Sequence, residues 1–167
     1  MSLGIAAESA MSTAEFDPMA EFKEGVKLLK NEYPQKALVK LRRVFECDKH
    51  NPYYMSFLGL SIGRAERKWD KAAELCEMAV QLRPNEIQFH LNLGEVYAAA
   101  GLREKALDRL DHALGIFRGD ARLKHARSRV EKRRSPLLPF IGRKHFLNRE
   151  LGKLRHRTLK GLNKDSN

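Results

Sequence analysis

The feature that most constrains the fold of this chain is a unit of about 34 residues that occurs three times in succession. Glycines mark it at separations of 34 and 35 residues: Gly25, Gly59 and Gly94. About a dozen positions after each glycine stands a small residue: Ala37, Ala72 and Ala106. Seven positions later comes another apolar column: Val44, Ala79 and Ala113. Because such a period is typical of helical arrays and solenoids, the sequence predicts stacked repeats.

Each unit contains two stretches with the hydrophobic period of an amphipathic helix. In the third unit the helices are expected near 87–100 and 103–117. Gly101 should end the first of them, since glycine readily adopts the left-handed conformation at a helix C-terminus. The second unit has one extra residue, which we expect in the turn around 64–68. Small residues in the shared columns predict a close approach of the two helices of each unit.

Several helix starts are indicated by a capping side chain. Two of them precede a proline at the first helical position: Asp17 before Pro18, and Asn51 before Pro52. Asn85, three residues before Gln88, is a weaker capping signal for the third unit. Asp120 is the expected cap of a last helix over 121–134. The sequence thus predicts helix pairs followed by one additional helix.

These columns resemble those of the tetratricopeptide repeat. The third unit carries the match through Leu93, Gly94, Tyr97, Gly101, Ala106 and Ala113, and the second through Leu58, Gly59, Trp69, Ala72, Ala79 and Pro84. In the first unit Glu24 stands where the family usually has leucine. The resemblance implies repeats over 18–51, 52–86 and 87–120. It implies an all-α fold, a right-handed superhelical stack of helix-turn-helix repeats with a C-terminal capping helix.

Three segments organise the chain. Residues 1–16 are expected to be a loose leader, and 17–134 hold the repeats and the capping helix 121–134. Residues 135–167 begin with an uncharged link containing prolines and end in a basic amphipathic helix. Its cationic face predicts contacts with an anionic partner, and the residues expected to make them are Arg149, Lys153, Arg157, Lys160 and Lys164.

Charge is distributed unevenly along the chain. Residues 1–117 contain 16 Lys and Arg against 17 Asp and Glu, whereas residues 118–167 contain 16 against 4. The whole net charge of +11 therefore comes from the last 50 residues. A basic C-terminal arm favours an anionic partner, which could be an acidic protein, a nucleic acid or an anionic membrane surface. A merely solubilising tail is the alternative.

No catalytic or metal-binding motif is found in the sequence. The nucleophile elbow, the zinc-protease pair of histidines, the phosphate loop and the dinucleotide fingerprint are all missing. The six histidines are scattered, and Cys47 and Cys76 form no CxxC pair and are expected to be small buried apolar residues. We therefore expect no enzyme activity, no cofactor and no metal. The N-terminus lacks the basic start of a signal peptide, so a cytoplasmic location is expected.

The resemblance also implies a partner-binding groove lined by the first helix of each repeat. By position, its lining residues are Phe22, Val26, Lys30, Tyr53, Phe57, Arg64, Gln88, Leu91, Asn92 and Glu95. The family's basic clamp for acidic C-terminal peptides would fall on Phe22, Val26, Phe57, Gln88 and Asn92. None of these is a cation, so we expect a rather apolar groove and no binding of acidic chaperone C-termini.

The leading functional hypothesis is a non-enzymatic scaffold or adaptor that holds a segment of another protein in this groove, while the basic tail contacts an anionic partner. Two alternatives stay open. The chain also resembles small three-repeat chaperones of secreted or aggregation-prone clients, although those are usually acidic. It could instead bind nucleic acid or an anionic membrane surface through its tail, with the repeats serving as a scaffold or as the interface of a homodimer.

Overall fold

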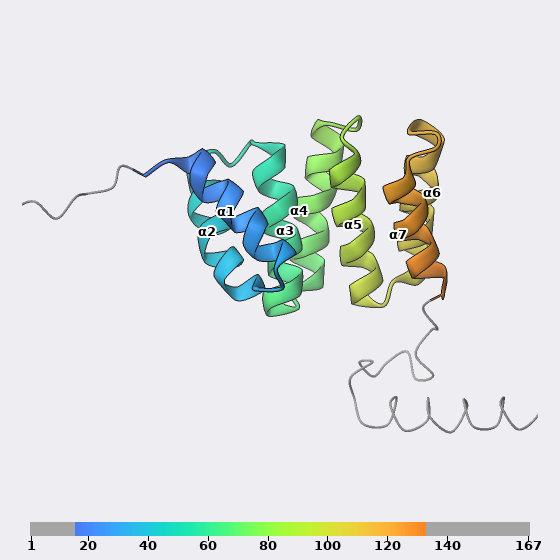
Figure 1. The fold of residues 1–167 in the computed structure, drawn as a ribbon, viewed down its shortest axis with the longest axis horizontal. Coiled ribbons are helices and arrows are strands. Elements are labelled where there is room, and N and C mark those ends of the chain that lie inside the picture. Colours follow the sequence, from blue (N-terminus) through green and yellow to red (C-terminus); the bar gives the residue numbers. More distant parts are fainter. Residues whose placement is uncertain (1–15, 133–167) are drawn as a thin grey trace, which may run out of the picture.

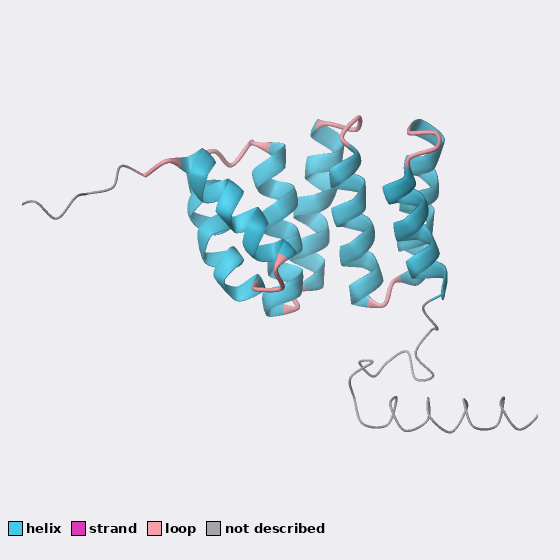
Figure 2. Cartoon of the chain, viewed as in Figure 1, coloured by secondary structure: helices cyan, strands magenta, loops and turns pink. Residues whose placement is uncertain are grey.

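A computed structural model of the chain describes residues 16–132. These residues form a single stack of seven α-helices and no strands. In chain order the helices are α1 (Pro18–Lys30), α2 (Pro34–Cys47), α3 (Pro52–Glu66), α4 (Trp69–Leu82), α5 (Ile87–Ala100), α6 (Arg103–Ile116) and α7 (Ala121–Lys132). Consecutive helices pack on one another, and the loops that join them lie alternately at one end and the other of the helices (Figures 1 and 2). The predicted all-α repeat architecture is confirmed.

Polar side chains cap the helix starts as expected at three places. The Asp17 carboxylate accepts a hydrogen bond from the Met19 amide at 2.8 Å, and the Asn51 side chain accepts one from the Tyr53 amide at 3.0 Å. Asp120 caps α7 by accepting from the backbone amides of the first turn. These contacts satisfy amide groups that have no partner within the helix.

The expected cap at Asn85 was wrong by one residue. Helix α5 begins at Ile87, so the capping position falls on Glu86, whose carboxylate accepts from the Gln88 amide at 3.4 Å. The extra residue of the second unit was also misplaced. It lengthens α3, which has 15 residues against 13 in α1 and 14 in α5, whereas the turn that follows α3 is as short as the one after α5.

Close packing explains the glycine column. A Cβ atom on Gly59 would lie 2.7 Å from the carbonyl oxygen of Ala72, and one on Gly94 would lie 2.9 Å from the Leu110 side chain. Both distances are shorter than real contacts of a Cβ atom. At Gly59 the obstacle is backbone, so the two helices can meet there only with glycine, whereas at Gly94 it is a side chain that can shift. The alanines of the next column, including Ala72, are completely buried at the same crossings. The second repeat is therefore held by an approach to backbone at Gly59, and the first and third by leucine side chains packed on Gly25 and Gly94.

The core runs without a break along the stack. Its largest fully buried apolar side chains come from four different helices: Leu41, Phe89, Leu93, Leu110 and Leu123. Cys76 is buried as expected, but Cys47 is exposed because it is the last residue of α2 and lies beyond the packed face. Helix α7 packs on α6 and α5 through Leu123 and Val130 and closes the described core. Among residues 16–132, no helix combines the length and apolar character that a membrane span needs.

Candidate partner-binding groove

The odd-numbered helices form the inner, concave face of the stack. Helix α3 packs on both α1 and α5, and α5 packs on α7, whereas α2, α4 and α6 pack only on odd-numbered helices. The odd-numbered helices are therefore closer together than the even-numbered ones, which makes their side the concave one. Figure 1 shows α1, α5 and α7 on the side that faces the viewer.

The ten residues expected to line the groove all belong to α1, α3 and α5. Most of their side chains are half-buried, as a groove wall would be, while Lys30 is exposed and Asn92 is buried. The structure brings them into three local arrangements: an aromatic cluster at the N-terminal end, an arginine that joins three helices, and a pocket beside α7.

The aromatic cluster fills the N-terminal part of the inner face. The ring of Phe22 lies 5.2 Å from that of Tyr54 and 5.4 Å from that of Phe57. Tyr53 packs edge-on against Phe89 at 4.9 Å, and its hydroxyl donates to the Glu86 carboxylate at 2.7 Å. This hydrogen bond to Glu86 is the main reason why the pKa of Tyr53 is raised. These rings are mainly occupied with one another, and Val26 lies half-buried on the same helix as Phe22.

Arg64 joins the three inner helices of the repeats. Its Nε atom donates to Glu95 of α5 at 2.6 Å, and a terminal nitrogen donates to the backbone carbonyl of Leu29 in α1 at 2.9 Å. The side chain is only 26% exposed. Because a charge-assisted bond to a planar guanidinium fixes geometry as well as charge, Arg64 positions α1, α3 and α5 relative to one another.

A short polar chain connects α5 with α3 beneath the groove surface. The side-chain amide of Gln88 donates to Asn92 at 2.8 Å, and Asn92 in turn donates to the hydroxyl of Ser56 at 2.9 Å. Ser56 and Asn92 are almost completely buried, so these bonds satisfy groups that would otherwise be desolvated without a partner. Asn92 therefore uses its amide inside the protein, and Gln88 is the member of the pair nearer to the solvent.

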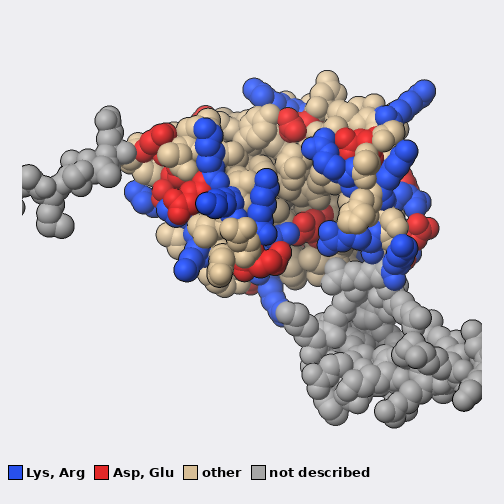
Figure 3. Space-filling model, viewed as in Figure 1, with Lys and Arg blue, Asp and Glu red and all other residues tan. Residues whose placement is uncertain are grey.

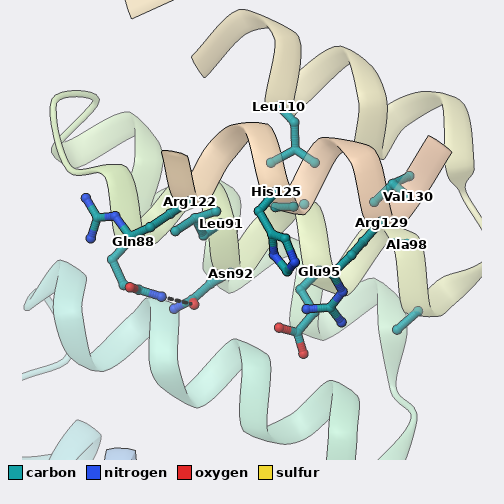
Figure 4. A pocket seen from close by; sticks show the side chains of 13 residues that line it. Gln88, Leu91, Asn92, Glu95, Ala98, Leu110, Arg122, His125, Arg129 and Val130 are labelled. Atoms are coloured by element: carbon teal, nitrogen blue, oxygen red, sulfur yellow. Dashed lines mark hydrogen bonds between the residues drawn. The ribbon is translucent and has the colours of Figure 1, made fainter. Parts of the chain in front are cut away.

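A pocket of about 440 Å³ lies on the inner face between α5 and α7. Four of the expected groove residues line it: Gln88, Leu91, Asn92 and Glu95. Its apolar floor is completed by Ala98, Leu110 and Val130. Figure 4 shows Arg129 and Glu95 at one end of the pocket, with Arg122 and Gln88 at the other.

The pocket wall formed by α7 was not foreseen from the sequence. Arg122, His125 and Arg129 line the pocket beside Ala126. The sequence of this helix has a thin apolar stripe of Leu123, Ala126 and Val130, and we expected the helix only to cap the stack. The spacing of 122, 125 and 129 places these side chains on one helix face next to that stripe, and this was the signal that could have indicated them.

Comparison with known proteins agrees with this architecture. A sequence model described as the tetratricopeptide repeat matches residues 64–130. The described helices form a tetratricopeptide-repeat domain. No curated protein sequence matches the chain.

Several solved tetratricopeptide-repeat structures superpose on the chain. The second such domain of human RPAP3, solved with the HSP70 peptide SGPTIEEVD, is 16% identical with a TM-score of 0.55, covering 70% of this chain and 100% of that one. The Sgt2 domain from Aspergillus fumigatus is 17% identical with a TM-score of 0.58, and the match covers 76% of this chain and 83% of the Sgt2 chain. A mutant O-GlcNAc transferase from Thermobaculum terrenum is 26% identical with a TM-score of 0.60 over 68% of this chain, but the match spans only 22% of the transferase.

None of the five expected clamp positions in this tetratricopeptide-repeat domain holds a charged residue. Figure 3 shows lysine and arginine side chains toward both ends of the viewed face, with uncharged surface and some acidic side chains between them. Arg122 is 3.1 Å from Asp120, and Glu95 is paired with Arg64, whereas Arg129 forms no ion pair with the described residues. Among residues 16–132, the pocket rim therefore carries a cation that has no acidic partner. Absence of binding to acidic chaperone C-termini stays a prediction.

Two further expectations concern sites that the structure tests only in part. Within residues 16–132, no group of three or more histidine, cysteine, aspartate or glutamate side chains is placed to hold a metal ion. The five tail cations assigned to an anionic contact lie outside the described residues: Arg149, Lys153, Arg157, Lys160 and Lys164.

Proposed function

We propose that the chain is a non-enzymatic adaptor that holds a segment of another protein along the concave face of its repeat stack, anchored in the pocket between α5 and α7. The observation that carries this proposal is the pocket itself. About 440 Å³ is open on the inner face where α5 faces the capping helix. Concave sites of this size with a few polar groups are typical ligand sites.

Similar domains support a protein or peptide as the partner. The human RPAP3 domain was solved with an HSP70 peptide, and the first domain of Spaghetti was solved with the HSP90 peptide SRMEEVD. The TPR2B domain of yeast Sti1 was likewise solved in a complex with pHsp70. With identities of 14–16%, these neighbours support the mode of binding and not the identity of the partner.

The proposed segment runs over the residues that remain accessible on the inner face. Leu91 and Gln88 offer a mixed apolar and polar surface, and exposed Ala99 lies at the edge of the same pocket. The aromatic cluster around Phe22 and Phe57 extends this surface toward the N-terminal repeat. Because the rings there are packed on one another, we expect the cluster to contribute an apolar patch to this surface. We place this activity in the cytoplasm, where free thiols such as those of the two cysteines persist.

Site-specific photo-crosslinking tests the proposal. A photoreactive phenylalanine analogue is introduced at Ala99, on the pocket, and in a matched variant at Val39, which is 62% exposed on the outer helix α2. Each full-length variant is irradiated in cells, and crosslinked peptides are identified by mass spectrometry. We expect Ala99 to yield one defined segment of a partner protein that Val39 does not yield. Crosslinks to that segment from Val39 but not from Ala99 would contradict the proposal.

A further inference from the structure

We infer that the pocket between α5 and α7 selects an acidic side chain next to an aliphatic one in the bound segment of a partner protein. This inference rests on the proposed function and specifies its ligand. It concerns the wall contributed by the capping helix, and it does not involve the five positions of the family's basic clamp.

The rim of the pocket has an excess of positive charge. Arg122 and Arg129 both line it, and Glu95 is the one acidic residue among the described residues that line it. The carboxylate of Glu95 is already occupied, because the Nε atom of Arg64 donates to it at 2.6 Å. Its repulsion of a ligand carboxylate is therefore largely cancelled, and the two α7 arginines determine which charge the pocket favours.

The two arginines have hydrogen-bond donors to spare. Arg129 forms no ion pair with the described residues, and Arg122 uses a terminal nitrogen for Asp120 at 3.1 Å. A guanidinium has five N–H donors in a planar arrangement that suits a carboxylate. The ring of His125 lies between them on the same helix face and adds a further polar group (Figure 4).

The floor of the pocket explains why an aliphatic neighbour should accompany the acid. Leu91, Ala98 and Val130 present methyl groups there, and Leu110 lies behind them. A purely acidic peptide would leave this surface in contact with water. A leucine or isoleucine beside the acidic residue would cover it and gain the usual contribution of apolar burial.

Charge also argues against the chain's own C-terminal segment as the occupant. Residues 133–167 contain 10 Lys and Arg against 2 Asp and Glu, a net charge of +8. Such a segment would be repelled by a rim that is itself cationic. The same positive charge, attached directly after α7, would instead attract an acidic partner toward the pocket.

Two matched fragments test the inference: N-acetyl-Glu-Leu-amide and its neutral analogue N-acetyl-Gln-Leu-amide. Each is titrated at millimolar concentration into the 15N-labelled full chain, and amide shifts are followed by NMR. We expect the acidic fragment to shift the amides of Leu91, Glu95 and Arg129, and to bind about tenfold more tightly than the neutral one. Two partly exposed charge contacts account for a difference of that size.

Variants of α7 locate the effect. In a chain carrying both R122Q and R129Q, we expect the acidic fragment to bind about tenfold more weakly, with binding of the neutral fragment unchanged. R127Q is the control: it removes one positive charge from the same helix, where the double variant removes two, but Arg127 pairs with Asp111 and Glu131 and does not line the pocket. The amide spectrum of each variant shows whether the stack is intact.

Several results would overturn the inference. Equal affinity for the two fragments, equal losses in R127Q and in the double variant, or no shift of the pocket amides with the acidic fragment would each do so. If changing Leu138 and Phe140 to serine shifts the pocket amides with no fragment present, the chain's own segment is the occupant. Shifts that depend on protein concentration would assign the pocket to a second copy.

These failures are distinct from a failure of the proposed function. A defined crosslink from Ala99 together with equal binding of the two fragments would retain the adaptor and reject its preference for acid. Acid-selective binding that depends on Arg129, combined with crosslinks only from the outer helix, would retain the pocket chemistry and reject the proposed route of the partner.

Discussion

Replacement of Gly59 by alanine should destabilise the stack more than a single methyl group normally does. The new Cβ atom would lie 2.7 Å from the Ala72 carbonyl oxygen, 2.8 Å from the Cys76 sulfur and 3.2 Å from the Leu75 Cβ atom. Rotation of a side chain can move neither the Ala72 carbonyl oxygen nor the Leu75 Cβ atom. Overpacking costs about 1–3 kcal/mol, and we take the upper part of this range, about 2–3 kcal/mol, because the obstacle is backbone; alanine regains roughly 0.8–1 kcal/mol of helix propensity. We expect a net loss of about 1–2 kcal/mol.

Alanine at two other glycines should cost less stability than alanine at Gly59. At Gly94 the obstacle is the side chain of Leu110, which can move by a few tenths of an ångström, so G94A should cost less than G59A. At Gly115, also helical, nothing lies within 4 Å, so G115A should be neutral or stabilising by up to about 0.5 kcal/mol, since the position is near the helix end.

The assay is urea and thermal unfolding of the full chain, followed by circular dichroism at the helix band. For a stack of this size, the expected loss in G59A corresponds to a fall in Tm of about 3–10 °C. From the most to the least stable, the variants should rank G115A, G94A and G59A. The reasoning is refuted if G59A is as stable as the unsubstituted chain, because the backbone approach at that crossing would then not be tight.

Three further predictions follow from named contacts. R64M should lower the free energy of unfolding by about 1–3 kcal/mol, since it removes the hydrogen bonds to Glu95 and Leu29 but keeps most of the apolar stem of the side chain. An unchanged midpoint of the urea unfolding curve would show that Arg64 does not join the inner helices. R67G should raise stability by about 0.5–1 kcal/mol, because Arg67 ends α3 at a φ of 58°, a conformation that favours glycine; a lower Tm would contradict this. Burial lowers the pKa of His90, whose Nε2 atom forms a hydrogen bond with the Pro84 carbonyl, so the unfolded chain takes up a proton first as the pH falls. The free energy of unfolding should therefore decrease below about pH 6.5, and H90Q should lose that pH dependence. An identical pH profile in both chains would exclude His90 as the cause.

The helices could be predicted from the sequence because local chemistry and packing agree along the repeats. Gly59 and Gly94 occupy crossings where the two helices of a repeat approach closely, and Asp17, Asn51 and Asp120 cap the helices that follow them. Boundaries were less certain where two residues could serve as a cap. Asn85 and Glu86 are adjacent, and the helix begins after the second because its carboxylate reaches the Gln88 amide.

The groove could be predicted only in part, because sequence position does not show how side chains share space. Gln88, Leu91 and Glu95 do line an open pocket. Phe22 and Phe57 pack mainly on each other, and Asn92 turns inward to Ser56. These contacts depend on the distance between helices α1, α3 and α5, which no single repeat encodes.

The contribution of α7 was missed for a related reason. Its sequence is mostly basic with a thin apolar stripe, a pattern that equally suits a solvated capping helix. Only its position against α5 places Arg122 and Arg129 beside a cavity. Helix α7 therefore closes the end of the stack and forms one wall of the pocket with the same packing against α5.

Cysteine footprinting tests most directly whether a partner is held on the concave face. Cys47 is exposed and is replaced by serine, while Cys76 stays unreactive because burial raises the pKa of its thiol. A single cysteine is then introduced by A99C on the pocket, or by V39C on the outer helix, and its alkylation rate is measured with and without the crosslinked partner's segment. The account predicts that the partner slows alkylation at position 99 at least about tenfold and leaves position 39 unchanged. Protection at position 39 with full reactivity at position 99 would contradict it.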